Sequence, residues 1–258
     1  MSGPGTWLNA GWQVFDAEPA VADWVAATQP AALAAVRDAP VRHGGTWCVG
    51  LDALANDAAG RVGAGPPLSG AARDAATALA GRLPLHRAQV SVIYPGYPGR
   101  DPEESDAAHR FRLNRDAAHL DGVLPEGPAR RRHLREPHAW ILGLALTEAD
   151  AGAAPLVVWD GSHRLIRAAF AAALQGHDPA DWGNLDLTQA YGRVRAEVFA
   201  RCRRIALPLR PGQAVLLHRM AIHGVAPWQA GARSDPAGRA IAYFRPCLDD
   251  PADWMRLA

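Results

Sequence analysis

The chain has 258 residues, of which 49% are hydrophobic and 21% charged, so it is long enough to bury one large core as a globular domain. Its 27 cationic residues are all arginine and it contains no lysine, which excludes Schiff-base catalysis, pyridoxal-phosphate attachment and a Walker-type phosphate loop. A formal net charge of +1 gives no overall field that would attract nucleic acid or an anionic membrane.

Cysteine usage and hydropathy indicate the compartment. Cys48, Cys202 and Cys247 are far apart and odd in number, which favours reduced thiols over a disulfide framework or a zinc knot. No run of about twenty apolar residues could cross a bilayer, and the start MSGPGTWLNAGW lacks the basic and apolar regions of a signal peptide. We therefore expect a cytoplasmic protein with a small-molecule partner and no membrane or nucleic-acid partner.

Residues 1–85 are expected to form a largely helical N-terminal part. The Ala-rich segment 17–39 has apolar residues at helical spacing, and Pro30 predicts a break into two helices. A further helix is predicted over residues 70–82, with Ser69 as its N-cap.

Residues 86–258 change to short β-branched segments separated by turns. Strands are predicted at residues 87–94, 138–146, 154–160, 204–209, 214–218 and 239–244. Two helices are predicted at 164–174 and 188–201, the second after the capping candidate Asp186. Because strands and helices do not alternate regularly, an antiparallel barrel or sandwich with helices outside is favoured within one domain, residues 1–258.

Residues 95–109, PGYPGRDPEESDAAH, are polar and broken by Gly and Pro. Such a segment is typical of a surface loop, and a mobile lid over a pocket is the functional alternative.

His119 and Asp121 form an H-x-D pair, and in an extended segment their side chains point to the same side. A second histidine comes from RPGQAVLLHRMAIHGVAPW, which offers His218 and His223. Their odd offset puts these two on opposite faces of a regular strand, so only one can face a metal. Two histidines and one carboxylate leave coordination positions open, which suits Fe(II) oxygenases.

Four stretches, in this order and spacing, resemble the phytanoyl-CoA dioxygenase-like family of iron(II)/2-oxoglutarate-dependent oxygenases over roughly the C-terminal two thirds. They are AAHLDG, GAAPLVVWDGSHR, RPGQAVLLHRMAIHG and GRAIAYFRP. The resemblance implies a mainly β fold, a double-stranded β-helix (jelly roll, cupin-like) with flanking helices. It also implies that His119, Asp121 and His223 hold Fe(II), because the H-G at His223 matches the family's distal ligand. Gln213 departs from the acidic residue that many members have after the turn glycine.

An oxoacid cosubstrate inside an apolar barrel needs a partner for its far carboxylate, and a planar guanidinium supplies two parallel hydrogen bonds. The candidates after the distal histidine are Arg233, Arg239 and Arg245. Arg239 opens the strand RAIAYF in the position that resembles the family's cosubstrate arginine. Arg245, on the same face of that strand, is the reserve candidate, while Arg233 falls in a turn-rich loop.

Other side chains are candidates for the pocket wall. Gln89 shares a strand face with Ser91 and is a candidate cofactor contact. Tyr94 and Trp140 are candidate substrate contacts, with turn or core packing as the alternative. The basic run 130–135 either lies on a solvated turn or attracts an anionic substrate.

The resemblance implies that Fe(II), 2-oxoglutarate and O₂ hydroxylate a small-molecule C–H bond, with release of succinate and CO₂. The iron centre carries this chemistry, and no separate acid or base residue is expected. Asp121 argues against a halogenase, because its carboxylate occupies the position a halide would need. Two alternatives remain: a cupin-like metal-dependent enzyme that uses no 2-oxoglutarate, and a non-catalytic metal- or ligand-binding protein on the same fold. Succinate release separates them from the first interpretation.

Overall fold

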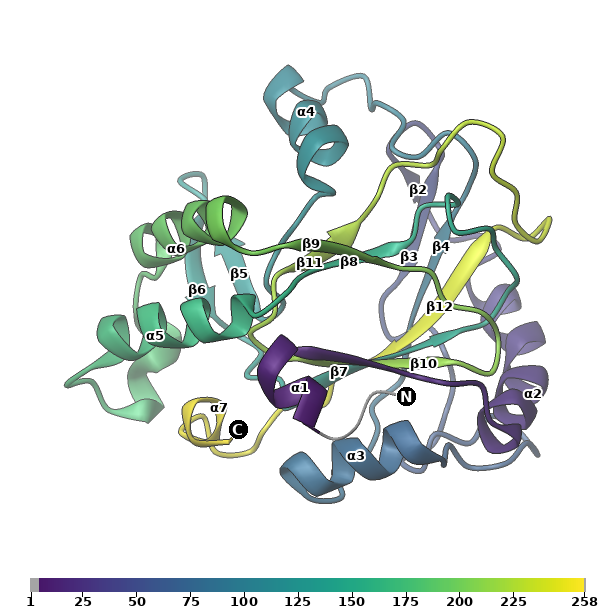
Figure 1. Cartoon of the computed structure of the whole chain (residues 1–258), viewed down its shortest axis with the longest axis horizontal. Helices are drawn as coiled ribbons and strands as arrows, with labels where there is room; N and C mark the ends of the chain where they lie inside the picture. The colour runs from purple at the N-terminus through teal and green to yellow at the C-terminus, as the bar shows by residue number, and fades with distance from the viewer. Residues whose placement is uncertain (1–4, 258) are drawn as a thin grey trace.

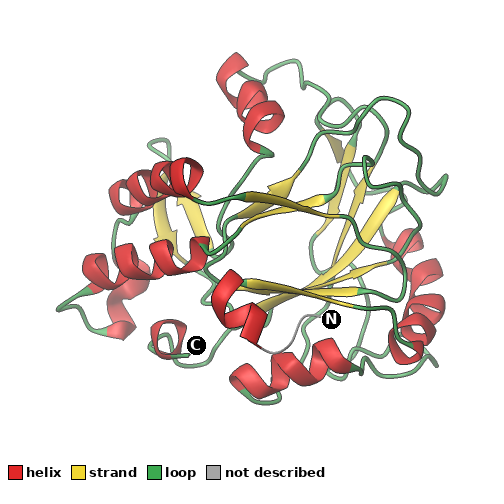
Figure 2. Ribbon diagram, viewed as in Figure 1, coloured by secondary structure: helices red, strands yellow, loops and turns green. Residues whose placement is uncertain are grey.

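The computed structural model describes residues 5–257, and its strands lie in the middle with helices outside (Figure 2). The strands are β1 Trp12–Phe15, β2 Val41–Arg42, β3 Trp47–Gly50, β4 Gln89–Ile93, β5 Val123–Glu126, β6 Arg131–Leu134, β7 Trp140–Ala145, β8 Leu156–Trp159, β9 Arg204–Leu207, β10 Ala214–His218, β11 His223–Val225 and β12 Arg239–Phe244. The helices are α1 Gly5–Ala10, α2 Pro19–Ala35, α3 Ala71–Ala80, α4 Asp106–Arg115, α5 Ser162–Leu174, the 3₁₀ helix η1 Pro179–Asn184, α6 Thr188–Arg201 and α7 Asp253–Arg256.

Two antiparallel sheets form the centre of the molecule (Figure 1). The large sheet has the strand order β1-β10-β7-β12-β4-β3-β2, and the smaller one has the order β11-β8-β9. From β7 onward the chain crosses repeatedly between them: β7, β10 and β12 join the large sheet, while β8, β9 and β11 join the small one. This exchange between two antiparallel sheets is the double-stranded β-helix, so the predicted jelly-roll fold is confirmed.

The space between the sheets is filled at one end by apolar side chains. This inner cluster comprises Ile141, Ala145, Leu156, Val158, Leu207, Leu209, Val215, Leu217 and Ile241. Because successive side chains of a strand point to opposite faces, the alternate residues of β7, Trp140, Leu142 and Leu144, join the outer core beneath the helices. In that outer core Trp24 of α2 packs edge-on against Phe244 of β12 at a ring-centroid distance of 5.9 Å.

Two local predictions in the N-terminal part are wrong. Helix α2 runs unbroken through Pro30, because its buried face continues past the proline to Ala32, which is fully buried, and packing outweighs the lost hydrogen bond. Helix α3 begins at Ala71 after Gly70, without a side-chain cap from Ser69. Its first free N–H instead donates to the Glu18 carboxylate over 2.8 Å.

The six predicted strands of residues 86–258 are all present, β10 and β12 with the predicted bounds and the other four with trimmed ends, and α5 and α6 lie where helices were predicted. The N-terminal part adds β1, β2 and β3 to the large sheet, although helices alone were predicted there. These strands have only four, two and four residues, too short for a period-two pattern to stand out. Among residues 5–257, no helix combines the length and apolar character needed to cross a membrane.

Candidate metal centre

Main-chain hydrogen bonds hold His119 and His223 side by side. The two residues form an isolated antiparallel bridge. The His119 N–H donates to the His223 carbonyl over 2.8 Å, and the His223 N–H donates to the His119 carbonyl over 3.1 Å. The imidazole ring centroids are consequently only 4.6 Å apart.

A glycine follows two of the candidate ligands, and in both places a Cβ would collide with backbone. At Gly224, directly after His223, a Cβ would lie 2.2 Å from the Asp116 carbonyl oxygen. At Gly122, directly after Asp121, φ is +78° and a Cβ would lie 2.0 Å from the Glu136 carbonyl oxygen. The H-G and D-G dipeptides are therefore required for the close approach of the segments that carry the ligands.

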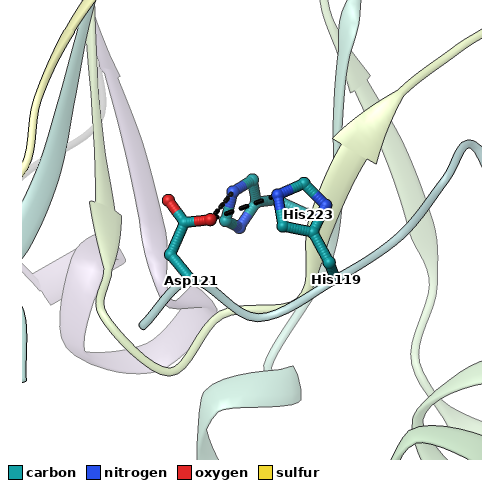
Figure 3. Close-up of side chains that lie close together, drawn as sticks. All are labelled: His119, Asp121 and His223. Carbon is teal, nitrogen blue, oxygen red and sulfur yellow. Dashed lines mark ion pairs between the residues drawn. The ribbon is translucent and has the colours of Figure 1, made fainter. Parts of the chain in front are cut away.

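The three side chains converge on one point (Figure 3). Asp121 Oδ1 lies 3.2 Å from His119 Nε2 and 3.8 Å from His223 Nε2. In each histidine Nδ1 lies 3.0 Å from a backbone carbonyl oxygen, that of Ala117 or Ala221. A proton on Nδ1 satisfies this carbonyl and leaves the Nε2 lone pair facing Asp121, which is the tautomer that binds a metal.

Electrostatics favour the protonation states that a divalent metal requires at His223 and Asp121, whereas at His119 burial acts to lower the pKa but Asp121 outweighs it and raises the pKa. Burial lowers the pKa of His223 to about 4, so this imidazole is neutral at neutral pH. Burial by itself would raise the pKa of Asp121, but the neighbouring His223, His119 and Arg245 outweigh it and hold the pKa well below its usual range. A neutral imidazole and an ionised carboxylate are ready to coordinate without losing a proton.

The donor set fits a catalytic Fe(II) better than a structural zinc. The ligand atoms of His119, Asp121 and His223 all lie within 4.8 Å of one another. The side chain of His119 is 48% exposed and that of His223 only 8%, so the cluster is open on one side. Two imidazoles and one carboxylate with an open side leave positions for exchangeable ligands, whereas structural zinc is closed by four protein ligands.

His218, the alternative distal ligand, lies elsewhere. Its ring contacts the rings of Trp7 and His163, at centroid distances of 4.9 and 4.8 Å. The structure therefore brings His223, and not His218, together with the H-x-D pair.

Arg239 is a buried cation whose terminal nitrogens have no protein partner. The residue is 5% exposed, and neither Nη1 nor Nη2 makes a hydrogen bond to any residue from 5 to 257. Its neighbours include the phenols of Tyr243 and Tyr97, which do not neutralise it, because burial raises the pKa of both phenols, that of Tyr97 to about 12. A buried guanidinium without a counter-charge is costly, so its two free nitrogens point to a carboxylate ligand.

Arg245, the reserve candidate, is committed to Asp121. Its Nη1 donates to Asp121 Oδ2 over 3.2 Å, and its Nη2 donates to Gln89 Oε1 over 2.8 Å. Asp121 therefore presents Oδ1 to the imidazoles and Oδ2 to the guanidinium. Gln89, predicted as a cofactor contact, holds Arg245 from the neighbouring strand β4.

The triad borders a cavity of about 250 Å³. Besides the three ligands, its wall includes Arg42, Trp47, Gln89, Ser91, Tyr243 and Arg245. Arg42, Trp47 and Tyr243 were not predicted from the sequence as wall residues. Arg42 lies on the short strand β2 and Trp47 on the short strand β3. Tyr243 could have been predicted, because its even offset from Arg239 puts both residues on one face of β12.

Neither predicted substrate contact lies on this wall. Trp140 is fully buried on the outer face of β7, where the Arg73 guanidinium lies over its ring at 5.6 Å. The next residue, Ile141, faces the cavity instead. Because side chains alternate along a strand, Trp140 points away from the cavity, and the predicted substrate contact is not found. Tyr94 is partly buried and packs against the outer core.

The basic run 130–135 is largely engaged with its own surroundings. Arg135 Nε donates to Glu126 Oε1 over 2.5 Å within the β5–β6 hairpin, and Arg131 forms an ion pair with Asp186 at 3.6 Å. The Arg132 guanidinium lies over the Tyr191 ring. None of these residues lines the cavity.

The segment 95–109 is a loop that ends in helix α4, which was not predicted. Ser105 caps this helix by accepting a hydrogen bond from the Ala108 N–H over 3.2 Å. Asp101 ties the loop to the β2–β3 turn by accepting from the His43 and Gly44 N–H groups. Although His43, Asp101 and Glu104 also lie within 4.8 Å of one another, Glu104 is ion-paired with Arg112, so this group is committed to local contacts.

No protein-family model matches the sequence, and no curated protein matches it. Among solved structures, the non-heme alpha ketoglutarate dependent carbocyclase SnoK from nogalamycin biosynthesis is 17% identical, with a TM-score of 0.48 over 100% of this chain and 91% of that chain. EvdO2 from Micromonospora carbonacea var. aurantiaca is 15% identical, with a TM-score of 0.49 over 99% and 97% of the two chains. EctD from S. alaskensis with bound Fe is 17% identical, with a TM-score of 0.44 over 95% and 77%. These likenesses are too low to carry an argument about activity, so the functional conclusion rests on the geometry of the site.

Proposed function

We propose that this protein is an Fe(II)- and 2-oxoglutarate-dependent oxygenase that hydroxylates a C–H bond of a small molecule. The observation that carries the proposal is the combination of two features in one barrel. One is an open set of two imidazoles and a carboxylate, and the other is the buried guanidinium of Arg239 with both terminal nitrogens free. The first suits a catalytic iron, and the second suits the far carboxylate of a dicarboxylic cosubstrate.

His119, Asp121 and His223 would hold the metal through Nε2, Oδ1 and Nε2. Fe(II) with 2-oxoglutarate and O₂ supplies the oxidising power for hydroxylation, with succinate and CO₂ as coproducts. The protein contributes binding and orientation. The apolar inner cluster behind the cavity keeps water from the far end of the barrel, and the open side of His119 admits substrate.

Arg239 would bind the C5 carboxylate of 2-oxoglutarate with its two Nη atoms. Tyr243, an immediate neighbour of the guanidinium, is a wall residue of the metal cavity, whereas Arg239 is not among the wall residues. Its phenol is therefore placed to donate a further hydrogen bond to the bound cosubstrate. A cupin-like enzyme that uses no oxoacid, or a metal-binding protein without activity, would have no use for a buried guanidinium that lacks a partner.

Arg245 would act as a positioning residue for Asp121. Because the hydrogen bond from Arg245 occupies Oδ2, Asp121 would offer only Oδ1 to a metal. The hydrogen bond from Arg245 Nη2 to Gln89 fixes the plane of the guanidinium.

Membership of the phytanoyl-CoA dioxygenase-like family is the finer part of the proposal, and it rests on the four sequence stretches. Gln213, which departs from the family's pattern, caps its own turn by accepting a hydrogen bond from the Arg210 N–H over 3.0 Å, so the departure leaves the metal ligands untouched. We place the enzyme in the cytoplasm. An anionic substrate would meet Arg42 at the cavity wall, a better placed cation than those of the 130–135 run.

Succinate formation tests the proposed reaction. Purified protein is incubated aerobically with Fe(II), ascorbate and 2-oxoglutarate, and succinate is measured by mass spectrometry, with Asp121→Ala as the control that lacks a metal ligand. We expect slow succinate release from the wild type even without substrate, and none from the variant. Equal succinate from both, or none from an iron-loaded wild type, would contradict the proposal.

A further inference from the structure

A second cavity, of about 450 Å³, adjoins the metal cavity and shares Leu51 and Arg245 with it as wall residues. Its wall also carries a thiol, an imidazole and a carboxylate, those of Cys247, His138 and Glu136. The proposed oxygenase reaction uses none of the three.

The thiol and the carboxylate lie on either side of the His138 imidazole. Cys247 Sγ lies 3.6 Å from His138 Nδ1, and His138 Nε2 forms an ion pair, without a hydrogen bond, with Glu136 Oε2 at 3.2 Å. The backbone fixes the arrangement, because His138 and Cys247 face each other in an isolated antiparallel bridge and the flanking Ala139 N–H donates to the Pro246 carbonyl over 2.8 Å. The thiol, the imidazole and the carboxylate are thus arranged as nucleophile, base and orienting group, as in enzymes that activate a thiol.

His138 is held in its cationic form. The residue is 4% exposed, and although this burial acts to lower its pKa, the contacts with Cys247 and Glu136 and the charge of Asp121 outweigh it and raise the pKa to about 9. A cationic imidazole therefore lies beside the Cys247 sulfur, the placement in which a histidine assists a thiol nucleophile.

The other two cysteines provide an internal contrast. Cys48 is buried and Cys202 is half-buried, and burial raises the pKa of both thiols. Neither makes a hydrogen bond or ion pair with a histidine in the described part of the chain.

We propose that Cys247 is a reactive thiol and a covalent modification site, which takes small soft electrophiles, above all low-molecular-weight disulfides, into the second cavity. His138 stabilises the thiolate and Glu136 holds the imidazole in place. This assignment does not depend on the oxygenase function, because none of the three groups is a proposed metal ligand and no cosubstrate takes part.

The modification is a balanced thiol–disulfide exchange. The Cys247 sulfur attacks one sulfur of the incoming disulfide, so a new S–S bond forms as the old one breaks. Cys247 is oxidised to a mixed disulfide, and the departing half of the reagent is reduced and leaves as a thiolate. That thiolate takes up the proton that Cys247 gave up, so no further oxidant or reductant is needed.

The charges of the cavity wall select among disulfides. Three carboxylates, those of Asp52, Glu136 and Asp249, face the His138 imidazolium, the His86 imidazole and the Arg245 guanidinium, which is already ion-paired with Asp121. The carboxylates outnumber the remaining cationic groups, so a cationic disulfide should enter more readily than an anionic one.

Alkylation rates of the three thiols in the intact protein test the proposal. The protein is treated at pH 7 with iodoacetamide, a neutral reagent, and the modified fraction of each cysteine peptide is followed by mass spectrometry. We expect Cys247 to react at least about tenfold faster than Cys202. Because Cys247 is also more exposed, His138→Gln is the deciding variant, and it should remove most of that advantage. Glu136→Gln should remove about half or more, and His177→Gln, at an exposed histidine, should change nothing.

Two outcomes overturn the proposal. One is a Cys247 rate no higher than that of Cys202 in the wild type. The other is a fast Cys247 whose rate is unchanged in both His138→Gln and Glu136→Gln, since exposure alone would then account for it. Glu136 is a surface residue, so its variant remains informative if His138→Gln fails to fold.

Disulfide probes test the chemical class. Cystamine, a dication, and oxidised glutathione, an anion, are compared at equal concentration with mixed-disulfide formation as the readout. For each cysteine we take the ratio of mixed disulfide formed with cystamine to that formed with oxidised glutathione. This ratio should be at least about threefold higher at Cys247 than at Cys202 in the same sample. A lead for oxidised glutathione, or the same preference at both cysteines, would contradict the assigned ligand class.

Discussion

Two pairs of histidines within residues 5–257 are in ring contact, and only one of these pairs suits a metal. The rings of His119 and His223 are 4.6 Å apart, and those of His163 and His218 are 4.8 Å apart. In the first pair Nδ1 faces a backbone carbonyl and Nε2 faces Asp121. In the second pair neither ring has a carboxylate within ion-pair distance among residues 5–257.

The second pair is instead built into the packing of the barrel end. His218 Nδ1 accepts a hydrogen bond from the Met220 N–H over 2.9 Å, and burial together with Arg219 holds its pKa well below the usual range. His163 fills the space beside Gly11, where a Cβ would lie 2.4 Å from its Nδ1. Proximity of two imidazoles is therefore not enough for a metal site, and the decisive features are a facing carboxylate and a free ring nitrogen.

The largest loss of metal binding should follow substitution of His119, which belongs to the first pair, or of the carboxylate that faces it. Asp121→Ala or His119→Ala should abolish binding of Mn(II), used as an oxygen-stable substitute for Fe(II), because two remaining ligands cannot hold a facial site. The loss of Mn(II) affinity should exceed the roughly 100-fold loss that follows removal of a residue that only orients a metal ligand. Isothermal titration with Mn(II) measures it, and a variant that binds within tenfold of wild type would contradict the assignment.

Arg245→Met should weaken Mn(II) binding by about 10- to 100-fold, because Asp121 loses the partner that orients it. Gln89→Leu should act in the same direction with a smaller effect, and Arg245→Lys should recover part of the loss. Arg233→Met, in a loop away from the cavity, is the matched control. Tighter binding by Arg245→Met would mean that Arg245 acts mainly by repelling the metal, and would remove its positioning role.

His218→Ala should leave Mn(II) affinity unchanged and lower the free energy of unfolding by about 1–3 kcal/mol, because the buried Met220 N–H loses its acceptor. Metal titration and urea denaturation of the same preparation separate the two effects. Loss of metal in His218→Ala with retention in His223→Ala would reverse the comparison between the pairs.

The smallest effect concerns the loop 95–109 and helix α4, which has no buried residue. Without ligands this segment should exchange amide hydrogens faster than the barrel strands. If the segment is a lid, filling the cavity with Mn(II), 2-oxoglutarate and substrate should slow its amide exchange by roughly fivefold. This corresponds to an increase of about 1 kcal/mol in the free energy of local opening. Strong and equal protection in both states would leave it an ordinary surface loop, the alternative that the sequence left open.

Local patterns predicted the parts of this molecule that depend on local chemistry. The H-x-D pair and the H-G at His223 each lie in one short stretch, so spacing and resemblance were sufficient to choose three side chains that the structure brings close together. The strand that begins at Arg239 was likewise predicted from its own residues. The cap on α3 was missed because Glu18 lies 53 residues from Ala71 in the sequence. The ion pair between Arg245 and Asp121 spans 124 residues, and no periodicity encodes such a contact. Trp140 was misassigned because the fully buried strand β7 has apolar residues on both faces. The sequence pattern therefore cannot show which face of the strand points into the barrel.

The most direct test of the central claim is an anaerobic titration of the Fe(II)-loaded protein with 2-oxoglutarate, followed by the metal-to-ligand absorption band. The wild type should develop the band, and Arg239→Ala should still bind iron but need far more 2-oxoglutarate. Loss of a charge-assisted bidentate partner costs about 2–5 kcal/mol, which corresponds to roughly 30- to several thousand-fold in affinity. Arg239→Lys should recover part of it, and Arg233→Ala should titrate like the wild type. If the iron-loaded wild type develops no 2-oxoglutarate-dependent band, or if Arg239→Ala titrates like the wild type, the account is contradicted.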